Sequence, residues 1–276
     1  MILSEQDARI GEILTEWNAV NPHFIINSGE TMMTSVKNET KLRTLSLALV
    51  SVFACLLAMP AHAELTGNIG VVSKYVLRGI TNNTESDTAT LQGGFDYSHK
   101  SGVYVGYWGS GLDYADKGVA VTGFENDIYG GYKMKAGPVD LDFGLIHYIY
   151  NQVTNSDGTE AVVAATLAGV TFKAKYLTDD VAWGNKGDIH WTADYGIGLP
   201  KEFKLAGSLG FYTYKDSGEF IASTVESSAF RHLNLALTHP LGKSGADMTV
   251  TYIIGGKDRQ GVDQKNAIVL GLSSAF

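Results

Sequence analysis

The sequence predicts an all-β fold, an antiparallel transmembrane β-barrel of about twelve strands with short periplasmic turns and longer extracellular loops. Three observations support this prediction. Apolar and polar residues alternate from residue 65 to residue 276, long and short connections alternate between the resulting segments, and the region before them resembles a secretory signal. Alternation with period two places successive side chains on opposite faces of a sheet, and an apolar outer face requires an apolar solvent such as a lipid bilayer.

The region before the alternating segments has the layout of a cleaved signal peptide. We assign residues 32–63 to it, because Lys37, Lys41 and Arg43 precede an apolar run that is too short to span a membrane as a helix. A small-residue site ends this run, and we expect cleavage after Ala63. The alternative is a signal that is retained as an anchor.

Residues 1–31 show neither the signal layout nor the alternation. We interpret them as an upstream extension from a start codon assigned too early, with a genuine cytoplasmic extension as the alternative. The barrel then comprises residues 64–276. Because Cys55 lies in the signal peptide, the barrel has no thiol for a disulfide, a nucleophile or a zinc site.

The charge balance also limits the class of protein. Residues 1–63 hold 4 basic and 6 acidic residues of the chain's 21 and 29, which leaves the barrel a net charge of −6. A nucleic-acid-binding protein would show a basic surface, so we expect no nucleic acid as a partner.

The alternation divides residues 65–276 into twelve candidate strands. The clearest has Ile189, Trp191 and Ala193 on one face, with polar residues between them. Turn-forming residues bound each segment. We predict strands at residues 65–78, 88–98, 102–113, 122–134, 139–150, 159–168, 170–178, 188–199, 202–214, 230–239, 246–256 and 265–276.

The connections between these strands are of two kinds. Tight connections follow the even-numbered strands, and they hold Pro138, Pro200 and Pro240, where proline removes no ladder hydrogen bond. Longer polar loops follow the odd-numbered strands. These loops are residues 79–87, 114–121, 151–158, 179–187, 215–228 and 257–264. Long loops at one end and short turns at the other, with both termini at the short end, are typical of outer-membrane barrels.

One face of the predicted strands is apolar over long stretches. Its residues include Leu65, Ile69, Val71, Tyr75, Leu77, Leu91, Phe95, Phe124, Ile128, Tyr132, Met134, Leu205 and Phe211. A charge at the middle of a lipid-facing surface costs about 2–4 kcal/mol, so this face favours a membrane barrel over a soluble sandwich or barrel, which is the alternative. Trp108, Trp191 and Tyr252 are candidates for the aromatic girdles at the membrane interfaces.

The last predicted strand ends in a candidate assembly signal. Phe276 is in phase with Leu270 and Leu272 on the outer face. This pattern is typical of the signal by which the barrel-assembly machinery recognises its substrates, although Ser274 stands where such signals usually carry an aromatic residue. We therefore expect the barrel-assembly machinery and outer-membrane lipid as partners, and the bacterial outer membrane as the location.

Three sequence blocks carry a family resemblance. They are LTGNIGVVSKYVLRGI at residues 65–80, LQGGFDYSHKSGVYVGYWGS at residues 91–110, and ENDIYGGYK at residues 125–133. They resemble the TorF family, a porin-like family of the bacterial outer membrane. The resemblance implies an outer-membrane β-barrel and no particular substrate, and it brings no functional residues to this chain.

The polar face of the predicted strands supplies the candidates for lining the pore. These are Lys74, Arg78, Asp96, Glu125, Asp127, Lys133, Asp140, Asp142, Lys173, Lys175, His190, Asp194, Lys204, His232 and Asp247. Twelve strands enclose more space than eight-stranded barrels and less than sixteen-stranded porins, so we expect a narrow pore.

The distribution of these charges leads to a hypothesis about the pore. The acidic residues concentrate on the second, fourth and fifth predicted strands, whereas Lys173, Lys175 and Lys204 lie on the seventh and ninth. Opposed acidic and basic walls would create a transverse field that orients small polar solutes. The alternative is that the charges form salt bridges that fill a narrow interior.

The function that this pattern favours is passive diffusion of small hydrophilic solutes or ions through a porin-like channel, without a cofactor or a metal. A plugged structural or surface-recognition barrel is the first alternative, and an outer-membrane enzyme acting on lipid is the second. No common catalytic motif is present. A constellation of His190, His232, Asp194 and Ser208 inside the lumen is the one arrangement compatible with catalysis, and we do not expect the protein to be an enzyme.

Overall fold

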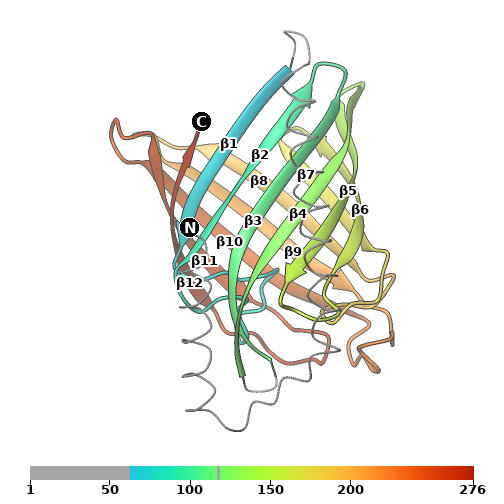
Figure 1. The fold of residues 1–276 in the computed structure, drawn as a ribbon. Coiled ribbons are helices and arrows are strands. Elements are labelled where there is room, and N and C mark those ends of the chain that lie inside the picture. The colour runs from blue at the N-terminus through green and yellow to red at the C-terminus, as the bar shows by residue number, and fades with distance from the viewer. Residues whose placement is uncertain (1–62, 117–118) are drawn as a thin grey trace, which may run out of the picture. The chain divides into compact units, whose positions relative to one another are not determined.

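The computed structural model describes residues 63–116 and 119–276, which form one closed antiparallel β-barrel (Figure 1). The predicted fold class is therefore confirmed. The twelve strands are β1 (Ala63–Val72), β2 (Thr90–His99), β3 (Val103–Asp116), β4 (Val119–Ala136), β5 (Val139–Asn151), β6 (Gly158–Leu167), β7 (Val170–Leu177), β8 (Ile189–Gly198), β9 (Lys204–Thr213), β10 (Ser228–Pro240), β11 (Ala246–Gly255) and β12 (Ala267–Ala275). In these residues no helix is long and apolar enough to cross a membrane. The predicted signal peptide and upstream extension lie outside the described residues, apart from Ala63.

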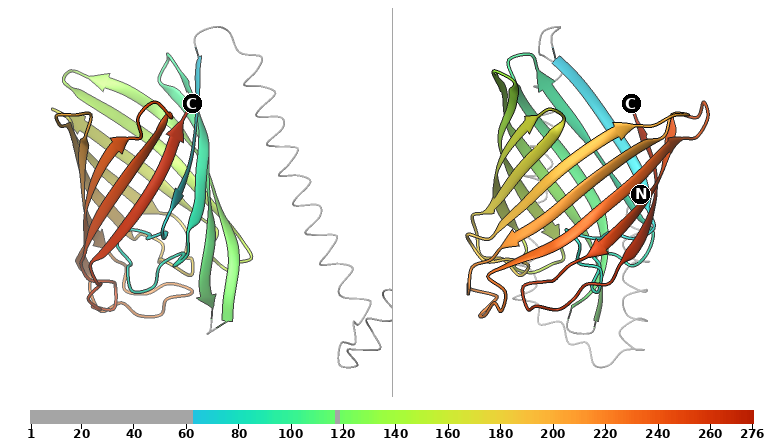
Figure 2. Two further views of the ribbon diagram at one scale, coloured as in Figure 1. Left: turned by 90° about the vertical axis from the view of Figure 1, so that its left-hand side faces the viewer. Right: turned by 180° about the vertical axis from the view of Figure 1, so that it is seen from behind.

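The barrel closes because β1 pairs with β12 as well as with β2. Strands β2 to β11 each pair with their two neighbours in sequence, so no strand of the barrel presents an unpaired edge. The strands tilt around a common axis (Figure 2). β1 begins and β12 ends at the end that holds the tight connections. We call this the turn end, and the opposite end the loop end.

The predicted strands match the observed ones to within a few residues, with two larger differences. β1 ends at Val72 instead of residue 78, because the chain leaves the wall at Ser73. β3 and β4 are longer than predicted, and their pairing continues to Asp116 and Val119. The loop expected at residues 114–121 is therefore mostly strand, because the two strands satisfy each other's backbone hydrogen bonds beyond the rim of the barrel.

The exterior of the barrel is apolar, as the alternation predicts. Leu91 is 61% exposed and Ile268 is 59% exposed, and both belong to a wide surface of large apolar side chains. Trp191 and Tyr252 also lie on this exposed surface. An exposed apolar surface of this extent is the reverse of what a water-soluble protein presents.

Three residues predicted to face outward lie inside the barrel instead. Tyr75 and Leu77 belong to the segment that leaves the wall after Val72, and both line the cavity described below. Trp108 also lines this cavity, and its ring meets that of Tyr75 edge to face, with the centroids 5.8 Å apart. The prediction was wrong for these aromatic rings because they pack against each other inside the lumen rather than against lipid.

Residues 73–89, which connect β1 to β2, fold into the barrel at the loop end, and we call this segment the inner loop (Figure 2). Arg78 and Gly79 form its sharpest bend, with positive φ angles of 47° and 76°. A Cβ atom at Gly79 would lie 2.6 Å from Cβ of His232 and 2.7 Å from the carbonyl oxygen of Arg231. Glycine therefore lets the inner loop approach β10 this closely.

The apolar exterior leads to a test that uses two neighbouring residues of β11. Val250 lies near the middle of the strand and faces outward, whereas Thr251 faces the lumen. In lipid vesicles we expect Val250→Arg to lower the free energy of unfolding by about 2–4 kcal/mol, because its charge meets hydrocarbon. Thr251→Arg should lower it less, since its side chain stays in the lumen. Equal losses in urea unfolding would show that the exterior does not face lipid.

Candidate functional site at the loop end of the lumen

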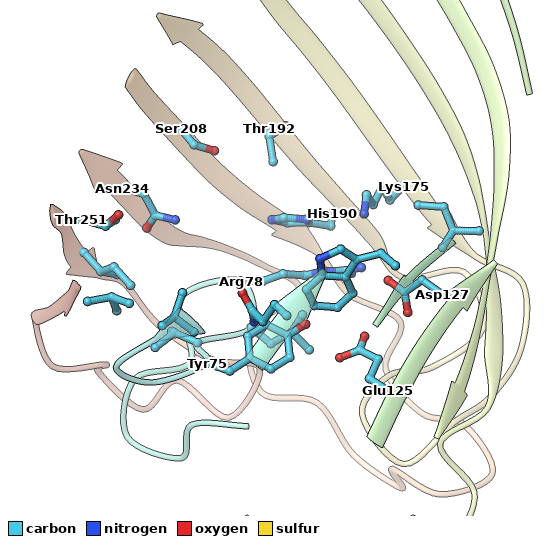
Figure 3. A pocket seen from close by; sticks show the side chains of 18 of the residues that line it. Tyr75, Arg78, Glu125, Asp127, Lys175, His190, Thr192, Ser208, Asn234 and Thr251 are labelled. Carbon is cyan, nitrogen blue, oxygen red and sulfur yellow. The ribbon is translucent and has the colours of Figure 1, made fainter. Parts of the chain in front are cut away.

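A cavity of about 650 Å³ occupies the loop-end half of the lumen, between the inner loop and the barrel wall (Figure 3). Eight of the residues predicted to line a pore line this cavity. They are Lys74, Arg78, Glu125, Asp127, Lys173, Lys175, His190 and Asp194. His232 lies just behind them, with its ring 5.7 Å from that of His190. The structure therefore brings together charges that lie on four separate segments of the sequence.

Six predicted lining residues lie apart from this cavity, toward the turn end of their strands. They are Asp96, Lys133, Asp140, Asp142, Lys204 and Asp247. Two of the carboxylates accept hydrogen bonds from tyrosines, Asp96 from the Tyr129 hydroxyl at 2.7 Å and Asp142 from the Tyr104 hydroxyl at 2.8 Å. The turn-end charges are thus distinct from those around the cavity.

Arg78 fixes the inner loop to the barrel wall. Its guanidinium donates two hydrogen bonds to the carboxylate of Glu160 on β6, each 2.7 Å long. It also donates to the hydroxyl of Tyr212 at 2.5 Å and to that of Tyr148 at 3.2 Å. The Arg78 and Glu160 side chains are 9% and 1% exposed, so this is a buried bidentate ion pair with most of its donors satisfied.

The inner loop is held at two further points. Arg231 on β10 donates from Nε and Nη2 to the backbone carbonyl of Arg78, at 3.3 Å and 3.2 Å. The side-chain oxygen of Gln264 accepts from the backbone amides of Thr81 and Asn82, each at 3.1 Å. These two contacts come from β10 and from the connection between β11 and β12, whereas Glu160 lies on β6 across the barrel, so the inner loop spans the lumen rather than lying along one wall.

Aromatic rings extend this network along β8 and β9. The imidazole of His190 stacks on Tyr212, and Tyr212 stacks on Tyr214, with the ring centroids 4.8 Å apart in both pairs. Arg231 lies over the Tyr212 ring, and Arg259 lies over the Tyr214 ring. These cation–π contacts stabilise positive charge beside the inner loop, and Arg259 also forms an ion pair with the carboxylate of Asp188.

Several charges that line the cavity are paired, and others are not. Lys173 lies 3.8 Å from the carboxylate of Asp194, whereas Glu125, Asp127 and Lys175 form no ion pair within the described residues. Part of the set therefore forms salt bridges inside the lumen, and three charged side chains of the cavity have no ion-pair partner among the described residues.

The hypothesis of directly opposed walls needs a correction. The acidic pair lies on β4 and the unpaired lysine on β7, and these strands are three positions apart in a barrel of twelve. They are separated by a quarter of the circumference rather than by the diameter. The charges nevertheless lie at similar depth, because Glu125 and Lys175 both lie in the loop-end half of their strands.

Several buried polar atoms around the cavity have no hydrogen-bond partner among the described residues. They include Oε2 of Glu125, Oδ1 of Asp127, Nε2 of His190 and Oδ1 of Asn234. Buried polar groups are normally satisfied by protein, water or ligand, so this concentration indicates a place where water or a solute binds. Figure 3 shows these side chains directed into the same space.

The arrangement does not form the catalytic constellation that the sequence permits. The hydroxyl of Ser208 donates to Asp194 at 2.6 Å, and Thr192 donates to the same carboxylate at 2.8 Å. His190 instead stacks on Tyr212. Because a serine–histidine–aspartate arrangement needs the histidine ring at hydrogen-bond distance from the serine hydroxyl, the contact of Ser208 with Asp194 does not form that arrangement. The described residues also contain no group of three metal-ligating side chains.

Sequence reasoning missed Glu160 and Arg231. On β6 the outward and inward faces are both apolar, with Val162 and Ala164 buried on the inward side, so the alternation does not show which face carries Glu160. The pairing of β9 with β10 shifts between Phe230 and His232, which changes the phase of the alternation at Arg231. A bulge of this kind has no signal in the hydrophobic pattern.

Burial perturbs two acidic groups of the inner loop. Burial, with a smaller contribution from the nearby carboxylate of Glu125 and opposed by Arg78, raises the pKa of Glu85 to about 7. Burial also raises the pKa of Tyr75 well above its usual value, with smaller contributions from Glu125 and Glu85. The inner loop therefore favours a protonated Glu85 when it is docked in the lumen.

The fold and this site define the protein as a closed β-barrel whose lumen is narrowed by its own first long loop. Residues 58–260 match the Gcw_chp family, described as bacterial proteins of unknown function, and the chain belongs to that family. No curated protein matches the chain. Membership of the TorF family stays a prediction.

The solved structures similar to this chain include two porins and an outer membrane phospholipase. The KdgM porin has a TM-score of 0.47 and 8% identity, covering 76% of this chain and 99% of that one. The NanC porin has a TM-score of 0.45 and 11% identity, covering 77% and 98%. Outer membrane phospholipase A from Escherichia coli has a TM-score of 0.40 and 10% identity, covering 79% and 98%. At these values the likeness concerns the fold alone.

The buried ion pair of Arg78 and Glu160 leads to a prediction for a variant that lacks the Arg78 guanidinium. Arg78→Ala leaves the carboxylate of Glu160 buried without a partner, which destabilises the docked inner loop by about 3–5 kcal/mol. We expect a larger single-channel conductance and faster proteolysis within residues 73–89. The double variant Arg78→Met with Glu160→Gln leaves no unpaired charge and should show smaller changes. Equal behaviour of the two variants would contradict the anchoring role of the pair.

The raised pKa of Glu85 predicts that docking of the inner loop depends on pH. The docked loop holds a proton that the free loop releases, so docking is strongest below the usual carboxyl pKa and weakens as pH rises to about 7. We expect a smaller single-channel conductance at pH 5 than at pH 7.5. Glu85→Gln should reduce this dependence, whereas Glu219→Gln, on an exposed loop, should leave it unchanged. An unaltered pH dependence in Glu85→Gln would contradict the assignment.

Proposed function

We propose that this protein is a channel of the bacterial outer membrane that lets small hydrophilic solutes diffuse passively through a lumen narrowed by the inner loop. The observation that carries the proposal is the combination of an apolar exterior with an interior cavity of about 650 Å³ lined by unpartnered polar atoms. An apolar exterior fits lipid, and a polar interior offers a solute replacements for its hydration shell.

The inner loop sets the size of the passage in this proposal. It joins β6, β9 and β10 through the contacts of Arg78, so it restricts the loop end while the turn end carries only short connections. Charged side chains at the cavity then bias which solutes pass. No step requires a catalytic residue, a metal or a cofactor.

The C-terminal residue fits the assembly route proposed for such a barrel. Phe276 exchanges backbone hydrogen bonds with Gly67 on β1, at 2.7 Å and 2.9 Å, and its ring lies edge to face with Phe95 on the exterior. The ring is 69% exposed and accessible to another protein before insertion in lipid. We propose that the barrel-assembly machinery recognises this strand and that β1 then closes on it.

The experiment is conductance of the purified full chain in planar bilayers, together with swelling of liposomes in small sugars and amino acids. We expect discrete conductance steps smaller than those of sixteen-stranded porins, because twelve strands and an inner loop leave a narrower passage. Absence of conductance and swelling in both the native protein and Arg78→Ala would refute the channel.

A plugged barrel is the second candidate, and the buried Arg78–Glu160 pair favours it because the pair holds the inner loop across the lumen. The two candidates differ in one result. A plugged barrel conducts only after Arg78→Ala releases the loop, whereas a channel also conducts with the loop in place. Hydrolysis of vesicle lipid by the native protein would instead support the enzyme alternative.

A further inference from the structure

The charges that line the cavity do not all cancel each other. Three ion pairs neutralise six charges at or beside the cavity, and these are Arg78–Glu160, Lys173–Asp194 and Lys74–Asp87. Among the cavity-lining residues described, Glu125, Asp127 and Lys175 form no ion pair. One ammonium group and two carboxylates therefore remain to interact with whatever enters the cavity.

The two carboxylates form a desolvated acidic pair. Glu125 and Asp127 lie two residues apart on the inward face of β4, and Glu125 is only 1% exposed. Oε1 of Glu125 accepts a hydrogen bond from the Tyr150 hydroxyl at 3.0 Å, but Oε2 of Glu125 and Oδ1 of Asp127 have no partner among the described residues. The two carboxyl groups also lie within hydrogen-bond reach of each other, and a cation that donates to both stabilises their ionised forms.

Lys175 supplies the opposite charge a short distance along the wall. Its ammonium donates to the Tyr148 hydroxyl at 3.4 Å, which leaves donors free for an anionic group. Figure 3 shows the side chains of Lys175 and Asp127 directed into the same part of the cavity. Lys175 and Asp127 form no ion pair with each other. A molecule that carries both an ammonium group and a carboxylate group therefore finds a partner of opposite charge for each group.

We propose that the cavity binds a small zwitterion, with its ammonium group against Glu125 and Asp127 and its carboxylate against Lys175. The inference rests on the proposed channel function and names the class of solute that this channel selects. A simple cation would leave Lys175 unpaired, and a simple anion would be repelled by the two carboxylates. The volume of about 650 Å³ is within the range of small-molecule sites.

The test is binding of ω-amino acids to the purified full chain in detergent, measured by isothermal titration calorimetry. The series is glycine, β-alanine, 4-aminobutyrate and 6-aminohexanoate, with propylamine and butyrate as analogues of 4-aminobutyrate that each lack one charge. We expect saturable binding of at least one zwitterion and binding of both analogues at least about tenfold weaker. No saturable binding across the series, or equal binding of either analogue, would overturn the proposal.

Two variants test the assigned groups, and each has a matched control at the turn end. Asp127→Asn and Lys175→Met should each weaken zwitterion binding by at least about tenfold. Asp247→Asn and Lys204→Met remove the same charges outside the cavity and should leave binding unchanged. Heat-modifiable migration on gels confirms the folding of each variant. The test needs only one of Asp127→Asn and Lys175→Met to fold. Unchanged binding in it would overturn the proposal.

Binding in detergent tests the zwitterion site, and conductance in bilayers tests the channel, so the two proposals can be refuted separately. A protein that conducts but binds no zwitterion overturns this inference and leaves the channel intact. A protein that binds a zwitterion but conducts neither as the native form nor as Arg78→Ala refutes the channel while the site stands.

Discussion

The buried ion pair between Arg78 and Glu160 determines how the lumen is divided. It joins residues 82 positions apart in the sequence, so it forms only when the barrel wall and the inner loop are both in place. A buried ion pair is stable only if its remaining donors and acceptors are satisfied, and the hydroxyls of Tyr148 and Tyr212 serve this purpose. The pair acts together with the contacts of Arg231, Gln264 and Trp108 that also hold the inner loop inside the barrel.

The position of the inner loop creates the functional site. A loop that crosses the lumen excludes water from one side of the cavity, which strengthens the electrostatic interactions within it. The loop also brings its own residues to the wall, since Tyr75 meets Trp108 and Gly79 lies against β10. The cavity is thus formed jointly by the barrel, which a regular pattern specifies, and by one irregular segment.

The sequence predicts the regular part well because the barrel follows from local patterns. Side-chain alternation, turn residues and connection lengths predict twelve strands and the ends at which they connect. The inner loop has no such signal: residues 73–78 continue the alternation of β1, so the pattern alone places Arg78 on the wall. Only the three-dimensional partners of Arg78, on β6, β9 and β10, show that the chain has turned inward.

The sequence predicts which residues of the candidate site face the lumen, but not which of them lie together or form ion pairs. The alternation identifies Glu125, Asp127 and Lys175 as lumen-facing, but the acidic and basic residues predicted to face the lumen nearly balance in number and indicate no preference for either charge. Pairing removes some of these charges from consideration, since Lys173 is paired with Asp194 and Arg78 with Glu160. Among the described residues, the cavity-lining charges without an ion pair are Glu125, Asp127 and Lys175, so the charges that the fold leaves unpaired have both signs within one cavity.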